Sequence, residues 1–399
     1  MAPTICGRCA ASGLRPSQRQ LSSTKSWRFD SDIRRQKHSA FRPRHEFDKI
    51  HSQILCRYAS SSSSSSSTKN KPLKAQAEPK LSSILADVNP PASTRPPALD
   101  RPPTLPRNSS IWKRFGWLIS TGRAFLRFYK AGLKNVYQNQ KVTRPMRIAL
   151  GLPSFLPTSM PPARGHHGPS SSSTALISQM DSLKMSRADF QLVRRSAYDI
   201  RRMIPFGLIL LVCGEFTPLL VAMLGNAVTP FVCRLPKQND KTRKNRHELK
   251  RQALLATQAD LGSATPIPSG SDQELEWLAK NFGSRDVIIE KSSASAQFVL
   301  RGCAAFGLVK SLNRPPWLVS LVYRPRLIRW AEYLELDDKM LLRGSGVKAL
   351  NAEEVRIAVE ERGGVWLDDA ELDPVDREAR NREWLARWFA ARRSILEGS

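Results

Sequence analysis

The stretch that decides the fold is Ile204–Cys233, IPFGLILLVCGEFTPLLVAMLGNAVTPFVC, with 30 residues and one charged side chain, Glu215. About 20 apolar residues are enough to cross the hydrocarbon core of a bilayer. Pro205 suits the first turn of a helix, whereas Pro218 predicts a kink or a break. We therefore expect a transmembrane segment over 204–233, either one kinked helix or two half-helices. A buried core helix of a soluble protein is the alternative, and the Lys and Arg residues on both flanks argue against it.

Glu215 is the single ionisable group of this stretch. Placing a charged carboxylate inside a bilayer is costly, so an intramembrane acid predicts a functional site. Glu215 could bind or relay a cation or a proton. It could instead stay protonated, or hydrogen-bond the backbone that Pro218 frees. Because one span cannot form an ion pathway alone, transport would also require a homo-oligomer.

The chain is strongly basic, with 63 Lys and Arg against 35 Asp and Glu, and a net charge of +28. The excess lies in the N-terminal half, while the last third is nearly neutral. A basic chain favours anionic partners such as phospholipid, RNA or a nucleoprotein surface. The cysteines do not suggest a disulfide framework, because half of the six lie in the first 56 residues.

The N-terminal region predicts import into mitochondria followed by a linker. Residues 1–58 are rich in Arg and Ser and contain no acid before Asp30, as is typical of a mitochondrial presequence. A disordered basic arm of a nuclear protein is the alternative. Residues 59–109 contain a run of eight serines and many prolines, which predicts a disordered linker.

Residues 110–203 predict basic amphipathic helices joined by a Pro/Ser-rich linker. Apolar residues recur every three or four positions over 111–138, which predicts a helix after an N-cap at Ser110. The apolar positions are Phe115, Leu118, Gly122, Phe125, Leu126, Tyr129, Leu133 and Val136. Such a helix could lie on an anionic bilayer surface or pack on its neighbours with a solvated basic face. A second helix begins at the capping sequence Ser186–Asp189, and its arginines are expected to face away from its apolar stripe.

Residues 234–399 predict a compact helical domain. Asn351 with Glu354 forms a capping box, Gly363 ends that helix, and Asp373-Pro374 opens the last one. A further helix is expected over 294–312. The whole chain is therefore expected to be all-α: one kinked transmembrane helix plus a small helical matrix domain, with a disordered N-terminal region. Charge on the two flanks of the apolar stretch slightly favours a matrix location for the C-terminal side.

Sequence motifs of nucleotide-binding loops, zinc proteases and Cys/His metal sites do not occur in the chain. No pattern places a nucleophile beside a base. We therefore expect neither an enzyme nor a bound cofactor or metal.

Several short motifs lie in the same order as in a known family. They are Met185-Ser186-Arg187-Ala188-Asp189, Arg194-Arg195 with Asp199, Ile204-Pro205-Phe206, Glu215-Phe216-Thr217-Pro218, Asp337-Asp338-Lys339-Met340, GVKALNAEEV from Gly346 to Val355, and Arg362-Gly363. Together they resemble the motifs of the Letm proteins of the mitochondrial inner membrane, named for a leucine zipper, an EF-hand and a transmembrane segment. The resemblance covers residues 111–365.

The resemblance implies a matrix-side ribosome-binding domain that anchors mitochondrial ribosomes to the inner membrane and supports translation and protein insertion. It also implies, as an alternative, potassium/proton or calcium/proton exchange and control of mitochondrial ion content and volume. The chain lacks the EF-hand loop pattern of the longer members. It also lacks a long heptad region after residue 365.

Two basic clusters are candidates for binding ribosomal RNA or ribosomal proteins, since Lys and Arg neutralise phosphates. The first follows the apolar stretch and comprises Arg234, Lys237, Lys241, Arg243, Lys244, Arg246, Lys250 and Arg251. The second comprises Arg324, Arg326 and Arg329. The alternative for both is a solvated flank that only sets topology. The expected partners are thus the mitochondrial ribosome, inner-membrane lipid and a second copy of the chain.

Overall fold

A computed structural model describes residues 85–106, 110–155, 157, 171–213, 228–260, 267–364 and 373–397. Within these ranges the fold is all-α, as predicted, and no strand occurs. The expected presequence, the first part of the expected linker, and both Glu215 and Pro218 lie outside the described residues.

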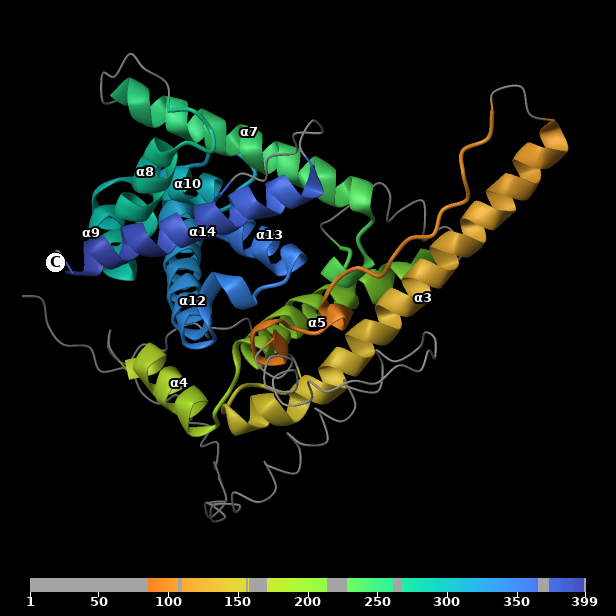
Figure 1. The fold of residues 1–399 in the computed structure, drawn as a ribbon, viewed down its shortest axis with the longest axis horizontal. Coiled ribbons are helices and arrows are strands. Elements are labelled where there is room, and N and C mark those ends of the chain that lie inside the picture. The colour runs from red at the N-terminus through yellow and green to blue at the C-terminus, as the bar shows by residue number, and fades with distance from the viewer. Residues whose placement is uncertain are drawn as a thin grey trace, which may run out of the picture. The chain divides into compact units, whose positions relative to one another are not determined.

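Figure 1 shows the helices of the described residues. They are α3 (Ile111–Ala149), α4 (Ser171–Ser182), α5 (Arg187–Cys213), α7 (Pro236–Asp260), α8 (Asp272–Phe282), α9 (Arg285–Ala294), α10 (Ala296–Ala305), α11 (Pro316–Leu318), α12 (Arg324–Arg343), α13 (Ala352–Glu361) and α14 (Pro374–Glu397). Single turns add η1 (Ala92–Thr94), η4 (Phe231–Cys233) and η6 (Gly346–Ala349), and η5 (Val319–Tyr323) is a π-helical turn.

Helix α3 lies antiparallel beside α5 (Figure 1). The Thr143 hydroxyl lies 3.1 Å from that of Ser196, and the Arg147 guanidinium donates to the Val193 carbonyl at 2.7 Å. Higher numbers on α3 therefore meet lower numbers on α5. The helix expected over 111–138 is confirmed but runs on through Pro145 to Ala149. Ser110 precedes it without a side-chain capping bond.

The start of α5 is fixed by its cap, as predicted. The Ser186 hydroxyl accepts from the Asp189 backbone N–H at 3.2 Å and donates to the Asp189 carboxylate at 2.9 Å. Phe190 and Val193 are buried on the expected apolar stripe. The expectation that Pro205 opens a helix is wrong, because it lies inside α5. The cap at Ser186 has already started the helix, and the sequence between them offers no stop signal.

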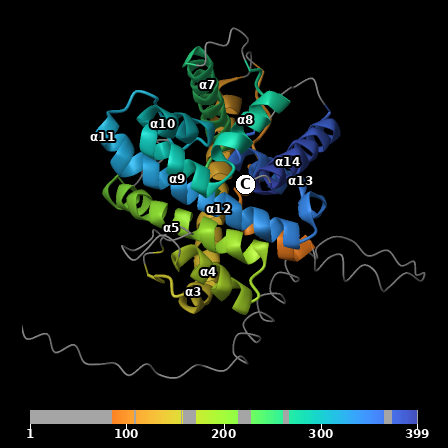
Figure 2. The same ribbon diagram turned by 90° about the vertical axis from the view of Figure 1, so that its left-hand side faces the viewer.

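The C-terminal helices pack around an apolar core. Leu278 of α8, Leu327 of α12 and Trp388 of α14 are fully buried, and α14 lies across α8 and α13 (Figure 2). Asn351 caps α13 by accepting from the Glu354 N–H at 3.0 Å, as predicted. The helix expected over 294–312 is α10, which begins at Ala296 because Ser295 caps it. Helix α10 then ends at Ala305, before Gly307 with φ +64°.

Residues 85–106 differ from the disordered linker expected for them. Val88 and Thr94 are buried. Asn89 donates to the Ala349 carbonyl at 2.7 Å and accepts from the Asn351 N–H at 2.8 Å. The prolines preset an extended backbone. The buried side chains of Val88 and Thr94 fix this backbone against α3, α5 and the C-terminal helices.

Candidate functional site

A buried network of ion pairs joins α5 to the C-terminal helices. Arg187 donates to Asp337 at 2.8 Å, and Arg362 donates to the same carboxylate at 2.8 Å. The neighbouring carboxylate, Asp338, forms ion pairs with Arg362 and Arg392. Because each of these charges is nearly or fully buried, their mutual pairing is what makes burial tolerable.

A second buried pair lies further along α5. Both terminal nitrogens of Arg195 donate to Glu354 at 2.8 Å, in a two-pronged contact. Arg194 lies over the Tyr333 ring, 3.4 Å from its centre, and pairs with Glu361 at 2.9 Å. The expectation that the α5 arginines face away from the packed side is therefore wrong for Arg187, Arg194 and Arg195, whereas Arg201 is exposed. Periodicity could not show it, because the carboxylate partners lie about 150 residues later in the chain.

The arginines of this network favour the charged form of two of its buried carboxylates. Burial alone would raise the pKa of Asp337, but Arg187 and Arg362 outweigh it and hold that pKa well below its usual range. The same balance, with Arg195 as the partner, lowers the pKa of Glu354. Most of these residues belong to the motifs that carry the family resemblance. In the structure they tie helices together, which is a structural role.

A third junction joins α5 to the residues at the end of the apolar stretch, Phe231 and Arg234. The Asp199 carboxylate accepts from the Phe231 backbone N–H at 2.5 Å, and Arg234 donates to the Tyr198 hydroxyl at 2.5 Å. Burial raises the pKa of Asp199 to about 7, although the Phe231 N–H acts to lower it. We name the contacts of Tyr198 and Asp199 with Phe231 and Arg234 the return clamp. Arg234, expected on a ribosome-binding surface, is buried in it.

The other cations of the first basic cluster lie along α7 and divide into two groups. Lys237, Lys241, Lys244 and Arg246 are exposed, all in the first half of the helix. Arg243 is half-buried and pairs with Glu360 at 2.8 Å. We name the exposed side chains of Lys237, Lys241 and Lys244, which share one side of the helix, the α7 cationic face. Arg246 lies on the opposite side, where its side chain runs beside Gly307.

The end of α7 does not extend this face. Lys250 is buried, 2.6 Å from the Glu274 carboxylate, and it donates to the Gly363 carbonyl at 2.7 Å. Arg251 is exposed, but Glu248 holds its guanidinium at 2.8 Å. Lys250 is therefore not on an open cationic surface, whereas Arg251 is exposed in an ion pair with Glu248.

The second basic cluster lies at the start of α12, where its arginines make internal bonds. Arg324 donates to the Ser292 hydroxyl at 3.0 Å, Arg326 to the Leu308 carbonyl at 2.8 Å, and Arg329 to the Pro325 carbonyl at 3.2 Å. Trp317 and Leu321, directly before them, are 67% and 70% exposed. This surface is mixed apolar and cationic rather than purely cationic.

Large apolar side chains are exposed at two helix ends. On α3, Trp112 is 82% and Leu126 is 69% exposed, whereas Phe128 and Val136 are buried. The apolar face expected for this helix is thus uncovered over its first half, and a neighbouring face packs on the protein. On α5, exposure rises toward the end, with Leu211 at 83%.

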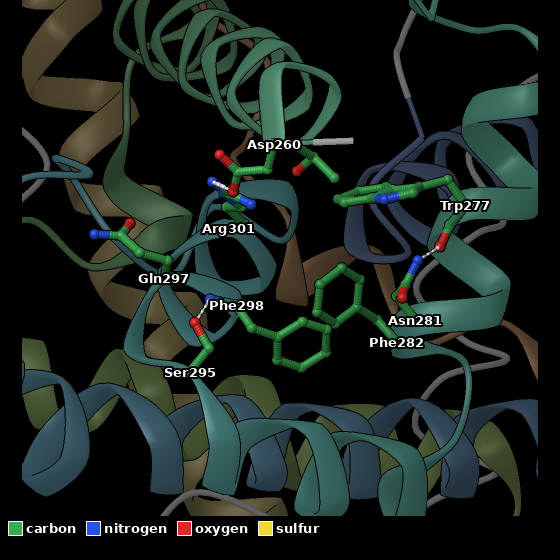
Figure 3. Close-up of a pocket in the computed structure, with 9 residues that line it drawn as sticks. Asp260, Trp277, Asn281, Phe282, Ser295, Gln297, Phe298 and Arg301 are labelled. Carbon is green, nitrogen blue, oxygen red and sulfur yellow. Dashed lines mark hydrogen bonds and ion pairs between the residues drawn. The ribbon is translucent and has the colours of Figure 1, made fainter. Parts of the chain in front are cut away.

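One hollow of about 210 Å³ lies between α7, α8 and α10 (Figure 3). Trp277, Phe282 and Phe298 form its apolar lining, and the Asp260–Arg301 pair at 2.5 Å lies at its edge. Its polar groups bond one another, as Asn281 does by donating to the Trp277 carbonyl. The arrangement offers no nucleophile paired with a base.

The described residues contain neither a candidate membrane span nor a candidate metal cluster. No helix there combines the length and the apolar character that crossing a membrane needs. No group of three or more His, Cys, Asp or Glu side chains there could hold a metal ion. Among known proteins, no family model, no curated protein and no solved structure matches the chain.

Proposed function

We propose that this chain is a mitochondrial inner-membrane adaptor that docks the mitochondrial ribosome on the matrix side. The observation that carries the proposal is the α7 cationic face. It presents three exposed cations in the first turns of a helix that begins three residues after the apolar stretch. Cations held on a rigid helix suit attraction to closely spaced rRNA phosphates.

The arrangement around α7 supports docking rather than a purely solvated flank. The return clamp fixes the start of α7 to α5, and Lys250 fixes its second half to α8. A cationic face held at both ends loses little conformational freedom on binding. The exposed apolar end of α5 would keep the same body at a bilayer surface.

Ion exchange, the alternative suggested by the sequence, depends on Glu215, which lies outside the described residues. The contacts of the described residues add no observation that favours it. The described contacts therefore support the adaptor function.

The test is gradient sedimentation of detergent-solubilised mitochondria at low and high salt, with detection of this chain. We expect co-migration with the large ribosomal subunit at low salt and its loss at high salt. The triple variant Lys237→Glu, Lys241→Glu and Lys244→Glu should abolish co-migration even at low salt.

The matched control carries the same charge change on other exposed lysines, Lys280→Glu, Lys310→Glu and Lys348→Glu. It should co-migrate as the unaltered chain does. Equal loss in both triple variants would mean that net charge, not the α7 cationic face, governs binding. Sedimentation of the unaltered chain away from ribosomes at both salt concentrations would refute the docking proposal.

A further inference from the structure

The two sides of the apolar stretch belong to one packed body. Arg187 and Arg195, which precede the stretch, form buried pairs with Asp337 and Glu354, which follow it. Asn89 exchanges hydrogen bonds with the backbone near Asn351 in the same way. A helix that crossed the bilayer once would separate these partners by the hydrocarbon core, about 30 Å thick. Buried pairs at hydrogen-bond distance exclude that separation.

The path of the chain leads to the same conclusion. Helix α5 runs 14 residues beyond Asp199 to Cys213, an advance of about 21 Å at about 1.5 Å per residue. The backbone N–H of Phe231 nevertheless donates to the Asp199 carboxylate at 2.5 Å. The chain therefore leaves the body along α5 and rejoins it at a point well before the end of that helix.

Two complete crossings do not fit either. Only 31 residues lie between Asp199 and Phe231, whereas two helical crossings need about 40 residues. The last turns of α5 are meanwhile increasingly apolar and exposed, with Ile204 at 51%, Leu208 at 60% and Leu211 at 83%. Their exposure requires an apolar environment, and the basic residues at the base of the helix suit anionic headgroups.

We propose that the chain is monotopic: the exposed end of α5 enters one leaflet of an anionic bilayer, and residues 85–203 and 228–397 lie on the same side of it. The bilayer partner is recognised by the apolar turns of α5 in the acyl region and by cations such as Arg201 in the headgroup region. This inference rests on the membrane attachment in the proposed function but not on ribosome docking. Both soluble flanks then share the compartment of the α7 cationic face.

The experiment counts accessible labels on single molecules. The full chain would carry Ser182→Cys before the stretch and Lys280→Cys after it, both at exposed positions. Cysteines other than the buried Cys233 and Cys303 are replaced by serine, namely Cys6, Cys9, Cys56 and Cys213. The protein is reconstituted into vesicles of phosphatidylcholine and an anionic phospholipid, collected by flotation and treated with a membrane-impermeant maleimide. Intact-protein mass spectrometry then gives the number of labels per molecule.

A monotopic chain gives molecules with two labels or none, whatever the mixture of orientations, and every molecule carries two labels once detergent is added. Molecules with one label in intact vesicles would overturn the proposal, because they are the signature of a single crossing. Failure of the chain to float with vesicles would overturn it as well. Neither outcome depends on ribosomes, so it is distinct from failure of the docking proposal.

A second measurement reports the contact itself. A nitrobenzoxadiazole fluorophore on Leu211→Cys should shift to the blue and be quenched by doxyl-labelled lipids. The same fluorophore on Leu342→Cys, a position 51% exposed on α12, should show neither change. An unshifted, unquenched signal at position 211 would remove α5 as the membrane contact.

Discussion

Two basic segments flank the apolar stretch, and the fold uses them in opposite ways. On α5, Arg187 and Arg195 are buried against carboxylates of the C-terminal helices. On α7, Lys241 and Lys244 are exposed. In composition the segments are alike, and a count of flanking charge treats them as equal. The difference teaches that the second segment presents a cationic surface, whereas the arginines that begin the first belong to the protein interior.

The largest expected effect comes from breaking the interior segment's network. Arg362→Ala should lower the free energy of unfolding by about 3–5 kcal/mol, because it leaves buried carboxylates uncompensated. Urea denaturation followed by circular dichroism measures this. The control Lys348→Ala, at an exposed position, should stay within about 0.5 kcal/mol of the unaltered chain. Similar values for the two variants would contradict a stabilising network.

The return clamp predicts a dependence of stability on pH. The pKa of Asp199 is about 7 in the folded chain against an ordinary 3.8, so the folded state holds the proton more tightly. Stability contributed by this group is present below about pH 4 and is lost as the pH rises through 7.

Asp199→Asn cannot ionise and isolates this effect. Relative to that variant, the unaltered chain should lose at least about 1.4 kcal/mol between pH 4 and pH 8, the equivalent of one pKa unit. Urea midpoints across this range measure it. A difference that stays constant, or that grows in favour of the unaltered chain as pH rises, would contradict the raised pKa.

Gly132 lies where helix α3 packs closely on η4, the turn that ends the apolar stretch. A Cβ there would lie 2.8 Å from the Cys233 sulfur and 3.3 Å from the Val232 carbonyl oxygen. Gly132→Ala should therefore destabilise the chain by about 1 kcal/mol or more. Gly122→Ala, with open space around it, should instead stabilise by about 0.5–1 kcal/mol. Thermal melts of the two variants should move in opposite directions, and a shift of both in one direction would contradict the close approach.

The smallest effect is expected on the exposed segment. The double variant Lys241→Ala and Lys244→Ala should change the free energy of unfolding by no more than about 0.5 kcal/mol per site relative to the unaltered chain, because both side chains are solvated. Calorimetry measures this directly. A large destabilisation would mean that these lysines pack on the protein and do not form a free cationic face.

The sequence by itself determined the local structure. Ser186 and Asn351 cap their helices, Gly363 ends α13, and Pro374 opens α14, as their side chains dictate within a few residues. It also determined that the described chain is helical. The end of α10 was missed, because apolar residues continue past Ala305, whereas Gly307, with φ +64°, ends the helix.

Only the tertiary structure decided which charges are free. Arg195 pairs with Glu354, 159 residues later in the chain, and Lys250 of α7 pairs with Glu274 of α8. Periodicity reports which residues share a helix face but not what that face meets. The arginines at the start of α5 were therefore expected to face away from the core, and the sequence left open whether the apolar face of α3 packs on the protein or lies on a bilayer. The return clamp is of the same kind: it joins Asp199 to Phe231, 32 positions later, and no local pattern indicates that contact.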